Sequence, residues 1–290
     1  MKQIFSRRSF LASIAAGGAF CIVPRHATGW AGGTPSSNDL GFPRIDFHAH
    51  VEENMTLERA LELARQRGVR LGIAEHGGCH EGMKNDAEMK LYIERLAGQP
   101  VYKGMQAEGH TWMRCFSKEV VAQLDFVLAD ALTFPEKDGR WVRLWPPEAQ
   151  ITDPQDFMER YVEFNVRVIS LEPIDIFANP TFLPEAIVKD YDALWTKERM
   201  RKVIDAAVKY GVAIEINSLY NIPSVPFLRM AKDAGVKFSF GSNAHGESVG
   251  ILDYSVKTAR ELGLTQDDMF VPAPADRKPI LRRALARGEG

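Results

Sequence analysis

Short apolar segments alternate with helical patterns along most of this 290-residue chain. Each apolar segment has the length of a strand, and a stretch of helical periodicity follows each of them. Strands that alternate with helices predict a parallel sheet. The expected strands cover residues 44–50, 69–76, 101–110, 124–130, 166–179 (in one or two pieces), 211–218 and 236–245. The helical patterns cover residues 56–67, 86–96, 117–123, 153–165, 197–210, 225–233 and 251–262.

The ends of these strands favour a closed barrel over an open sheet. No Gly-rich phosphate loop follows the first strand, so a dinucleotide-binding sheet is disfavoured. Nearly every expected strand ends in polar residues instead, and the C-terminal strand ends of a (β/α) barrel converge on one site. Residues two apart on a strand share a face, so these polar residues fall into groups that face the same way. The groups are Asp46 with His48 and His50, Gln106 with Glu108 and His110, Glu215 with Asn217, and Asn243 with His245.

Histidines gather at these strand ends. The chain has seven, and the six that follow residue 31 all lie at or just past an expected strand end. Buried strand ends are normally apolar unless their polar groups are paired or bind something. Imidazoles and carboxylates that converge at a barrel mouth suit a divalent transition metal such as Zn, Mn or Fe. The H-x-H pair of His48 and His50 has a spacing suited to one ion.

The order of these motifs resembles the PHP (polymerase and histidinol phosphatase) domain family. The resemblance runs from about Arg44 to Gly250 and rests on DFHAH, AEHG, GMQAEG, DFVLADAL, DIFANP, VAIEIN and GSNAH. It implies a distorted (β/α)7 barrel in a single domain. It also implies hydrolysis of phosphate esters on a cluster of two or three metal ions.

The chain departs from the resembling family at several ligand positions. Thr56 and Leu132 stand near positions where that family has histidines. Gln106 stands for a Glu, Asn179 for a His and Asn243 for an Asp. Neutral amides attract cations less than carboxylates do. We therefore expect one or two divalent ions rather than a full cluster.

These motifs define a predicted site. The best expected ligands are His48, His50, His76 and His245, with Glu108, His110, Asn179 and Asn243 as further residues of the metal site. Glu108 or Asp130 is the expected catalytic base or additional ligand. Residues expected to face the substrate are Gln106, Glu215, Asn217 and Arg143, although Glu215 and Asn217 have an equal claim to bracing neighbouring loops. Asp46 is expected to be structural.

The N-terminus resembles a twin-arginine export signal. Arg7 and Arg8 precede an apolar run that is too short to span a bilayer. We expect a signal at residues 1–31, a linker at 32–43, the barrel domain at 44–275 and a basic tail at 276–290. The expected protein is periplasmic or secreted, has the twin-arginine export machinery as a partner and has no stable membrane span after signal removal.

Charge and cysteine content bear on the class of binding partner and on the compartment of the protein. The net charge is −2 at pH 7, and removal of the four cationic residues of the signal would take it to −6. This balance gives no reason to expect nucleic acid, and we expect a small-molecule substrate. Cys79 and Cys115 remain after the signal and could form one disulfide in an oxidising compartment.

Three functions stay open from the sequence. The first is an exported metal-dependent hydrolase that acts on a phosphate ester or a carbohydrate-derived small molecule. The second is a degenerate, non-catalytic relative, which the substituted ligand positions favour. The third is a non-phosphatase metalloenzyme, either amidohydrolase-like or a sugar lyase. The bridging Lys expected of an amidohydrolase is not found at a middle strand end.

Overall fold

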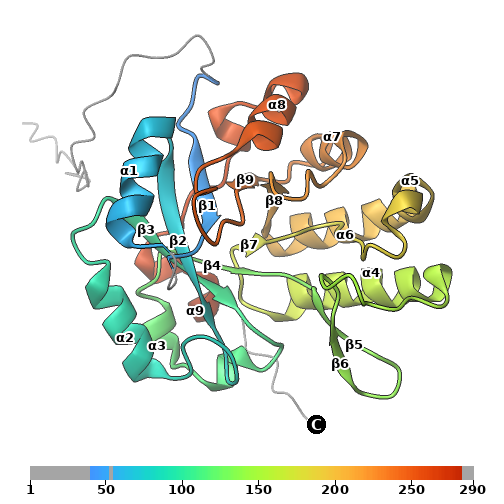
Figure 1. Ribbon diagram of the computed structural model, residues 1–290, viewed down its shortest axis with the longest axis horizontal. Helices are drawn as coiled ribbons and strands as arrows, with labels where there is room; N and C mark the ends of the chain where they lie inside the picture. The colour runs from blue at the N-terminus through green and yellow to red at the C-terminus, as the bar shows by residue number, and fades with distance from the viewer. Residues whose placement is uncertain (1–39, 52–54, 283–290) are drawn as a thin grey trace, which may run out of the picture. The chain divides into compact units, whose positions relative to one another are not determined.

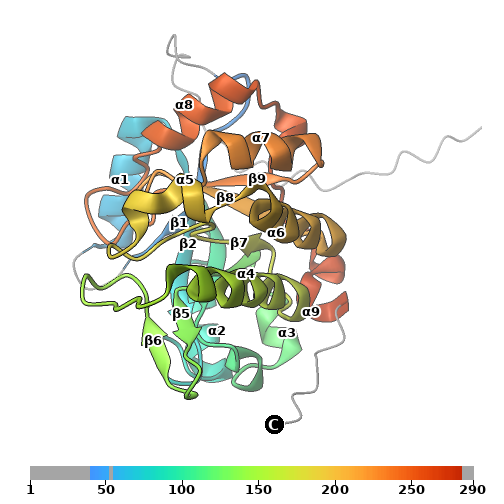
Figure 2. The same cartoon turned by 90° about the vertical axis from the view of Figure 1, so that its right-hand side faces the viewer.

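The strands form the closed parallel barrel that the sequence predicts. The structure is a computed structural model that describes residues 40–51 and 55–282. Its barrel has the strand order β1-β2-β3-β4-β7-β8-β9, and the last strand pairs with the first. Helices surround the strands (Figures 1 and 2). The single α/β domain with a closed seven-stranded barrel is therefore confirmed.

The elements have the following bounds. The barrel strands are β1 (Ile45–Ala49), β2 (Arg70–Gly77), β3 (Val101–Ala107), β4 (Phe126–Ala129), β7 (Ile176–Phe177), β8 (Ala213–Asn217) and β9 (Phe238–Gly241). A separate antiparallel hairpin comprises β5 (Thr133–Pro135) and β6 (Trp141–Arg143). The helices are α1 (Leu57–Arg67), α2 (Asp86–Arg95), α3 (Lys118–Val121), α4 (Pro154–Leu171), α5 (Tyr191–Leu194), α6 (Lys197–Tyr210), α7 (Val225–Asp233), α8 (Asp253–Leu262) and α9 (Pro279–Arg282). Short 3-10 turns are η1 (Trp112–Arg114), η2 (Val188–Asp190), η3 (Gln266–Asp268) and η4 (Ala275–Arg277).

One predicted strand is wrong over most of its length. Residues 166–171, expected to begin a strand, continue helix α4, and β7 keeps only Ile176 and Phe177. The β-branched residues Val166, Val168 and Ile169 suggested a strand. However, Val168 and Ile169 are buried in continuation of the helical pattern that begins at Phe157. Periodic burial along the helix therefore outweighs local β propensity.

Helix α1 begins and ends at residues whose chemistry fits those positions. Thr56 is the N-cap, and its hydroxyl accepts a hydrogen bond from the backbone N–H of Arg59 at 3.2 Å. Gly68 closes the helix in the left-handed conformation, with φ 63°. Thr56, where the resembling family has a histidine nearby, therefore has a structural role in this chain.

An irregularity in β1 alters the expected alternation of side chains. Between Asp46 and Ala49 the pairing with β2 shifts by one residue, as in a β-bulge. Phe47 packs on Phe126 with ring centroids 5.1 Å apart, while the adjacent His48 reaches Gln106 and Glu215. Both side chains consequently lie inside the barrel. Asp46 instead accepts hydrogen bonds from the segment that follows β9, so strict alternation is wrong here.

The interior of the barrel is apolar below the strand ends. We call this apolar layer the barrel floor. It consists of Phe47, Ala74, Phe126, Leu128, Ile176, Ala178 and Ala213, all of which are buried. The polar residues of the predicted site lie above it at the C-terminal ends of the strands, where a (β/α) barrel places its site.

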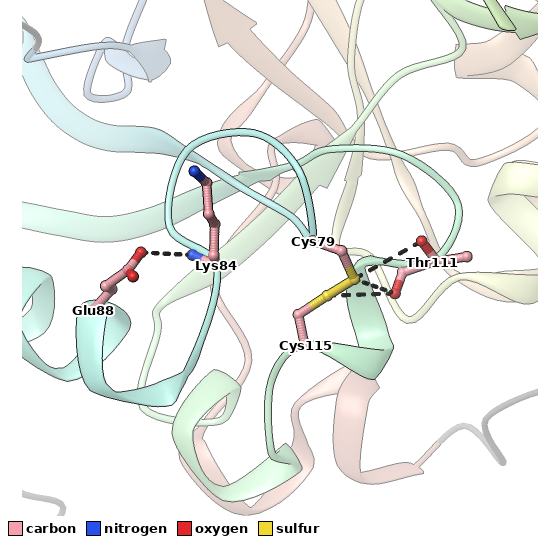
Figure 3. The surroundings of a disulfide bond; sticks show 5 residues. All are labelled: Cys79, Lys84, Glu88, Thr111 and Cys115. Atoms are coloured by element: carbon pink, nitrogen blue, oxygen red, sulfur yellow. Dashed lines mark hydrogen bonds between the residues drawn. A yellow bond between two sulfur atoms is a disulfide. The ribbon is translucent and has the colours of Figure 1, made fainter.

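A disulfide joins two loops at the C-terminal ends of β2 and β3. Cys79 and Cys115 are bonded, with Cα atoms 5.5 Å apart (Figure 3). Cys79 lies three residues after His76, and Cys115 lies in the segment that follows Glu108. The bond therefore ties together the loops beside two predicted site residues.

Loss of this disulfide should destabilise the protein. Its partners are 36 residues apart in sequence, and closing a loop of that length contributes about 4 kcal/mol by restricting the unfolded chain. We expect the variant Cys79→Ser/Cys115→Ser to lose about that much free energy of unfolding, measured by urea denaturation. Wild type with a thiol reductant is the matched control. Equal midpoints for oxidised and reduced wild type would contradict the expectation.

Glu172, at the end of α4, introduces a pH dependence of stability. Burial raises the pKa of its carboxyl to about 7, although the indole N–H of Trp112 donates to it at 2.8 Å and opposes the shift. A raised carboxyl pKa means that the native state binds more protons than the unfolded state. Stability therefore falls as the pH rises from about 4.5 to about 7, by up to about 3 kcal/mol.

The variant Glu172→Gln should remove this pH dependence. The Gln side-chain oxygen can still accept from Trp112, and the amide carries no charge at any of these pH values. We expect the variant to gain stability relative to wild type between pH 5 and pH 8, by up to about 3 kcal/mol in urea denaturation. Glu163→Gln, at an exposed position of α4, is the control. A difference that is constant with pH would contradict the assignment.

The folded region includes residues beyond the expected domain limits. Phe42 is buried and packs on Phe240, and α9 contributes the buried Ile280. The expected signal at 1–31 and most of the linker lie outside the described residues, as do residues 283–290. Within the described part of the chain, no helix combines the length and apolar character needed to cross a membrane.

Candidate metal centre

Three histidines from three strand ends form one cluster, which we call the histidine triad. His50 follows β1, His76 lies near the end of β2 and His245 follows β9. Each offers a ring nitrogen, and the three nitrogens lie within 4.8 Å of one another. The three rings are nearly parallel and their centroids form a triangle, with distances of 4.6 Å from His50 to His76, 4.2 Å from His50 to His245 and 5.8 Å from His76 to His245.

His50 is the residue of the triad that most clearly requires a ligand. It is fully buried, and neither of its ring nitrogens has a hydrogen-bond partner in the described part of the chain. A buried polar atom without a partner costs about 1–3 kcal/mol. Burial, followed by the neighbouring imidazoles, lowers the pKa of His50 well below its ordinary value. The ring is therefore neutral, which is the form that binds metals.

Glu108 orients the second member of the triad. Its Oε1 lies 2.7 Å from Nδ1 of His76. A carboxylate on one ring nitrogen fixes the tautomer and direction of a metal-binding imidazole. With Nδ1 engaged in this way, Nε2 is the nitrogen that His76 would contribute. Three imidazoles, one of them oriented by a carboxylate, fit a divalent transition metal such as zinc.

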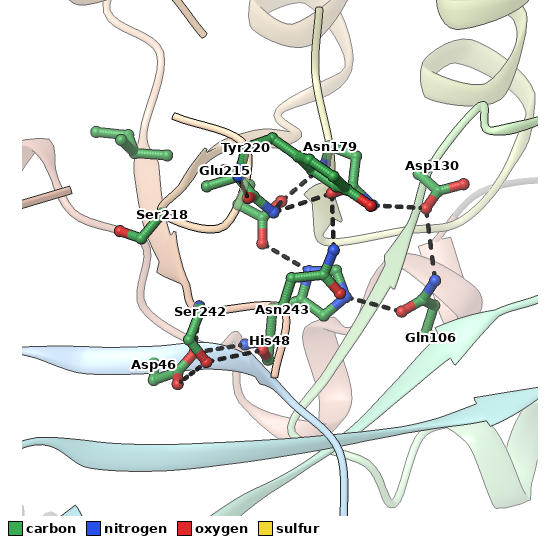
Figure 4. Close-up of polar contacts among 12 residues, drawn as sticks. Asp46, His48, Gln106, Asp130, Asn179, Glu215, Ser218, Tyr220, Ser242 and Asn243 are labelled. Carbon is green, nitrogen blue, oxygen red and sulfur yellow. Dashed lines mark hydrogen bonds and ion pairs between the residues drawn. The ribbon is translucent and has the colours of Figure 1, made fainter. Parts of the chain in front are cut away.

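Beside the triad, several predicted site residues bond to one another. We call this group the amide network. Its members, most of which are drawn in Figure 4, are His48, Gln106, Asp130, Asn179, Glu215, Asn217 and Asn243. Asn179 is central, because its Oδ1 accepts from the side chains of Asn217 at 2.9 Å and Asn243 at 3.2 Å. Its Nδ2 donates to Asp130 at 2.8 Å.

His48 belongs to the amide network through both ring nitrogens. Nδ1 lies 2.6 Å from Oε1 of Glu215, and Nε2 lies 2.8 Å from Oε1 of Gln106. Burial lowers the pKa of His48, but the charge and hydrogen bond of Glu215 outweigh it, so the net shift is upward. Burial raises the pKa of Glu215, but the charge and hydrogen bond of His48 outweigh it, so the net shift is downward. The sequence predicted His48 as a metal ligand together with the three triad histidines. In the structure, both of its ring nitrogens are engaged by Glu215 and Gln106.

Glu215 is held closely on all sides. Its Oε2 accepts from the backbone N–H of Asn179 at 2.7 Å and from Nδ2 of Asn217 at 3.1 Å. A Cβ at Gly241 would lie 1.9 Å from its Oε1, so only glycine fits there. The role that the sequence left open for Glu215 and Asn217 is thus at least partly a bracing one.

Asp130 lies at the edge of the amide network. It accepts from Asn179, from Nε2 of Gln106 at 3.4 Å and from the backbone N–H of Leu132 at 2.9 Å. Burial, followed by the charge of Glu108, raises its pKa to about 6. A carboxyl with such a pKa can hold or release a proton near neutrality.

Two predicted residues lie apart from both groups. His110 is exposed and stacks on Trp141 of the hairpin, with centroids 4.6 Å apart. Arg143 pairs with Glu81 at 3.0 Å and lies over the ring of Trp145. Neither contacts the triad through any of these interactions.

Sequence reasoning missed Glu75. Its Oε1 accepts from the backbone N–H of Val51 at 2.8 Å, which fixes the chain directly after His50. The available signal was a carboxylate immediately before His76 in an otherwise apolar strand.

The closed seven-stranded barrel, with its site at the C-terminal strand ends, defines the chain as a PHP-like α/β barrel. A crystal structure of histidinol phosphate phosphatase from Lactococcus lactis subsp. lactis, complexed with zinc, L-histidinol and phosphate, has this fold. The TM-score is 0.55 at 16% sequence identity, over 77% of this chain and 94% of that one. At this identity the likeness shows the fold alone.

Two further solved structures match the chain with TM-scores below 0.5. An archaeal ribonuclease P structure with mature tRNA matches at 16% identity, over 76% of this chain and 90% of the other, with a TM-score of 0.36. Dihydropteroate synthase from Thermus thermophilus matches at 13% identity, over 77% and 96%, with a TM-score of 0.37. No family model and no curated protein sequence matches the chain.

Proposed function

We propose that this protein is an exported metal-dependent hydrolase whose histidine triad binds one divalent transition metal. The observation that carries the proposal is His50, a buried neutral imidazole with two unsatisfied nitrogens beside two other imidazoles. Zn, Mn and Fe are the candidate ions. The likeness in fold to a phosphatase crystallised with zinc and phosphate supports the choice.

The substituted positions favour one ion over two. Gln106, Asn179 and Asn243 stand where the resembling family has ionisable ligands, and here they bond to one another or to neighbouring side chains. The side-chain oxygens of Gln106 and Asn179 are thereby engaged within the protein. A second cation at this place would have to displace those bonds and would gain only neutral oxygens.

The proposed substrate is a phosphate ester or a carbohydrate-derived small molecule. A bound divalent ion would supply Lewis-acid stabilisation of a phosphoryl oxygen and would lower the pKa of a water. Glu108 keeps His76 in its binding orientation. Asp130 accepts or returns a proton at its carboxylate, and Asn179 holds that carboxylate in place.

Export is part of the proposal. The paired arginines at positions 7 and 8 support passage through the twin-arginine machinery to the periplasm or outside the cell. The Cys79–Cys115 disulfide supports an oxidising compartment.

A panel of phosphate esters and glycosides tests the activity. We expect protein purified without chelators to hydrolyse a member of the panel, to lose activity with a chelator and to regain it with zinc or manganese. Asp130→Asn should keep the metal and lower kcat by about a hundredfold or more. Stoichiometric metal without turnover on any substrate would instead support the non-catalytic binding protein that the amide substitutions favour.

A further inference from the structure

A cavity remote from the triad is rich in positive charge. It has a volume of about 400 Å³ and lies between the start of β1, the end of α1 and the start of α8. We call it the basic cavity. Its lining includes Arg44, Arg67, Lys257 and Arg260, with Asp253 as its single carboxylate. This volume falls within the range of small-molecule sites.

Two arginines of the basic cavity are fixed by neutral partners. Nη2 of Arg44 donates to the backbone carbonyls of Arg67 at 3.0 Å and Gly68 at 3.3 Å. Nη1 of Arg67 donates to the carbonyls of Glu247, at 2.8 Å, and Val249. These bonds orient the guanidinium groups without neutralising their charge. A guanidinium that is already held loses less entropy when it binds an anion.

The carboxylate of Glu247, which also feels the charge of Arg67, is already paired. The carboxylate of Glu247 accepts hydrogen bonds from Nε and Nη2 of Arg59, at 2.9 and 2.6 Å. Its negative charge is therefore largely matched by Arg59 rather than by the arginines of the basic cavity.

The start of α8 also lines the basic cavity, and its first residue, Asp253, offsets part of the positive end of the helix dipole. This ten-residue helix begins at Asp253, and its N-cap, Leu252, makes no side-chain capping bond. Helix N-termini attract anions through their dipole and backbone N–H groups. The exposed side chain of Ile251 supplies an apolar wall beside the charges.

We propose that the basic cavity binds a small molecule through a phosphate or sulfate group. Four cationic side chains against one carboxylate, in a chain whose net charge is −2, select an oxyanion. The site is distinct from the triad. Arg44 precedes β1 and His50 follows it, so roughly 16 Å of strand separates the two ends.

The binding test uses the full protein after chelator treatment, so that phosphate cannot bind through a metal at the triad. Titration calorimetry with inorganic phosphate and with pyrophosphate should give saturable binding, and both anions should raise the thermal midpoint. Lys257→Glu and Arg260→Glu should each raise the dissociation constant by at least about tenfold. Arg44 and Arg67 are unsuitable for substitution because they also brace α1 and the segment after β9.

A charge reversal elsewhere is the matched control. Lys90→Glu, at an exposed position of α2, should bind both anions like wild type. Unchanged binding in Lys257→Glu and Arg260→Glu, or no saturable binding by wild type at millimolar anion, would overturn the proposal. So would binding to vesicles of anionic lipid without binding to the free anions. None of these outcomes depends on hydrolase activity at the triad.

Discussion

The variant His50→Ala should purify without bound transition metal. His50 lies beside both His76 and His245, and it is the triad member whose buried nitrogens have no hydrogen-bond partner among the described residues. Removal of a carboxylate that merely orients a ligand typically lowers metal affinity 10–100-fold, so loss of the ligand itself should lower it by more than about a hundredfold. Elemental analysis and competition with a chelating dye measure the effect.

Two further variants test this prediction, one with a smaller expected effect and one as a control. Glu108→Gln should weaken metal binding by about 10–100-fold, because it removes the charge that orients His76. His80→Ala, at an exposed position outside the triad, should bind metal like wild type. Added zinc should raise the thermal midpoint of wild type but not that of His50→Ala. Metal-free wild type, or equal metal in wild type and His50→Ala, would refute the site.

Glu215→Ala should cause a large loss of stability. Glu215 is buried, lies 2.6 Å from Nδ1 of His48 and accepts the backbone N–H of Asn179. Its removal leaves His48 and that N–H without their carboxylate. Loss of one partner of a buried ion pair costs about 3–5 kcal/mol. Urea denaturation of the chelator-treated protein measures this cost apart from any effect on the metal.

A double-mutant cycle shows whether the loss comes from the pair. His48→Ala should also destabilise, and the double variant Glu215→Ala/His48→Ala should lose less stability than the sum of the two single losses. Glu198→Ala, at an exposed position of α6, should change stability little. Strict additivity of the two substitutions would show that His48 and Glu215 do not stabilise each other.

The periodic segments of the sequence predict most of the barrel, and the failure at α4 has an identifiable cause. Local β propensity is strong at Val166, Val168 and Ile169, yet all three residues belong to helix α4. Whether an apolar run is buried as a strand or as a helix depends on its neighbours in space, which a single sequence does not contain. The hairpin of β5 and β6 was likewise missed, since its strands have only three residues each.

The candidate site could be predicted in composition but not in its division into two groups. Strand-end position brought the right residues to one mouth, including His50, His76 and His245. The rings of His48 and His50 lie 5.3 Å apart, yet His48 bonds to Gln106 and Glu215 while the nitrogens of His50 have no hydrogen-bond partner among the described residues. These partners come from other strands of the barrel, so spacing along the chain alone does not reveal the division.

The barrel floor closes the site on the N-terminal side of the barrel. Among the described residues, Phe47 and Phe126 pack edge to face beneath the polar residues and fill the interior there. A ligand would therefore approach His50 from the C-terminal side, where His245 is exposed. The same side of the barrel would serve both the arrival of the ion and its release.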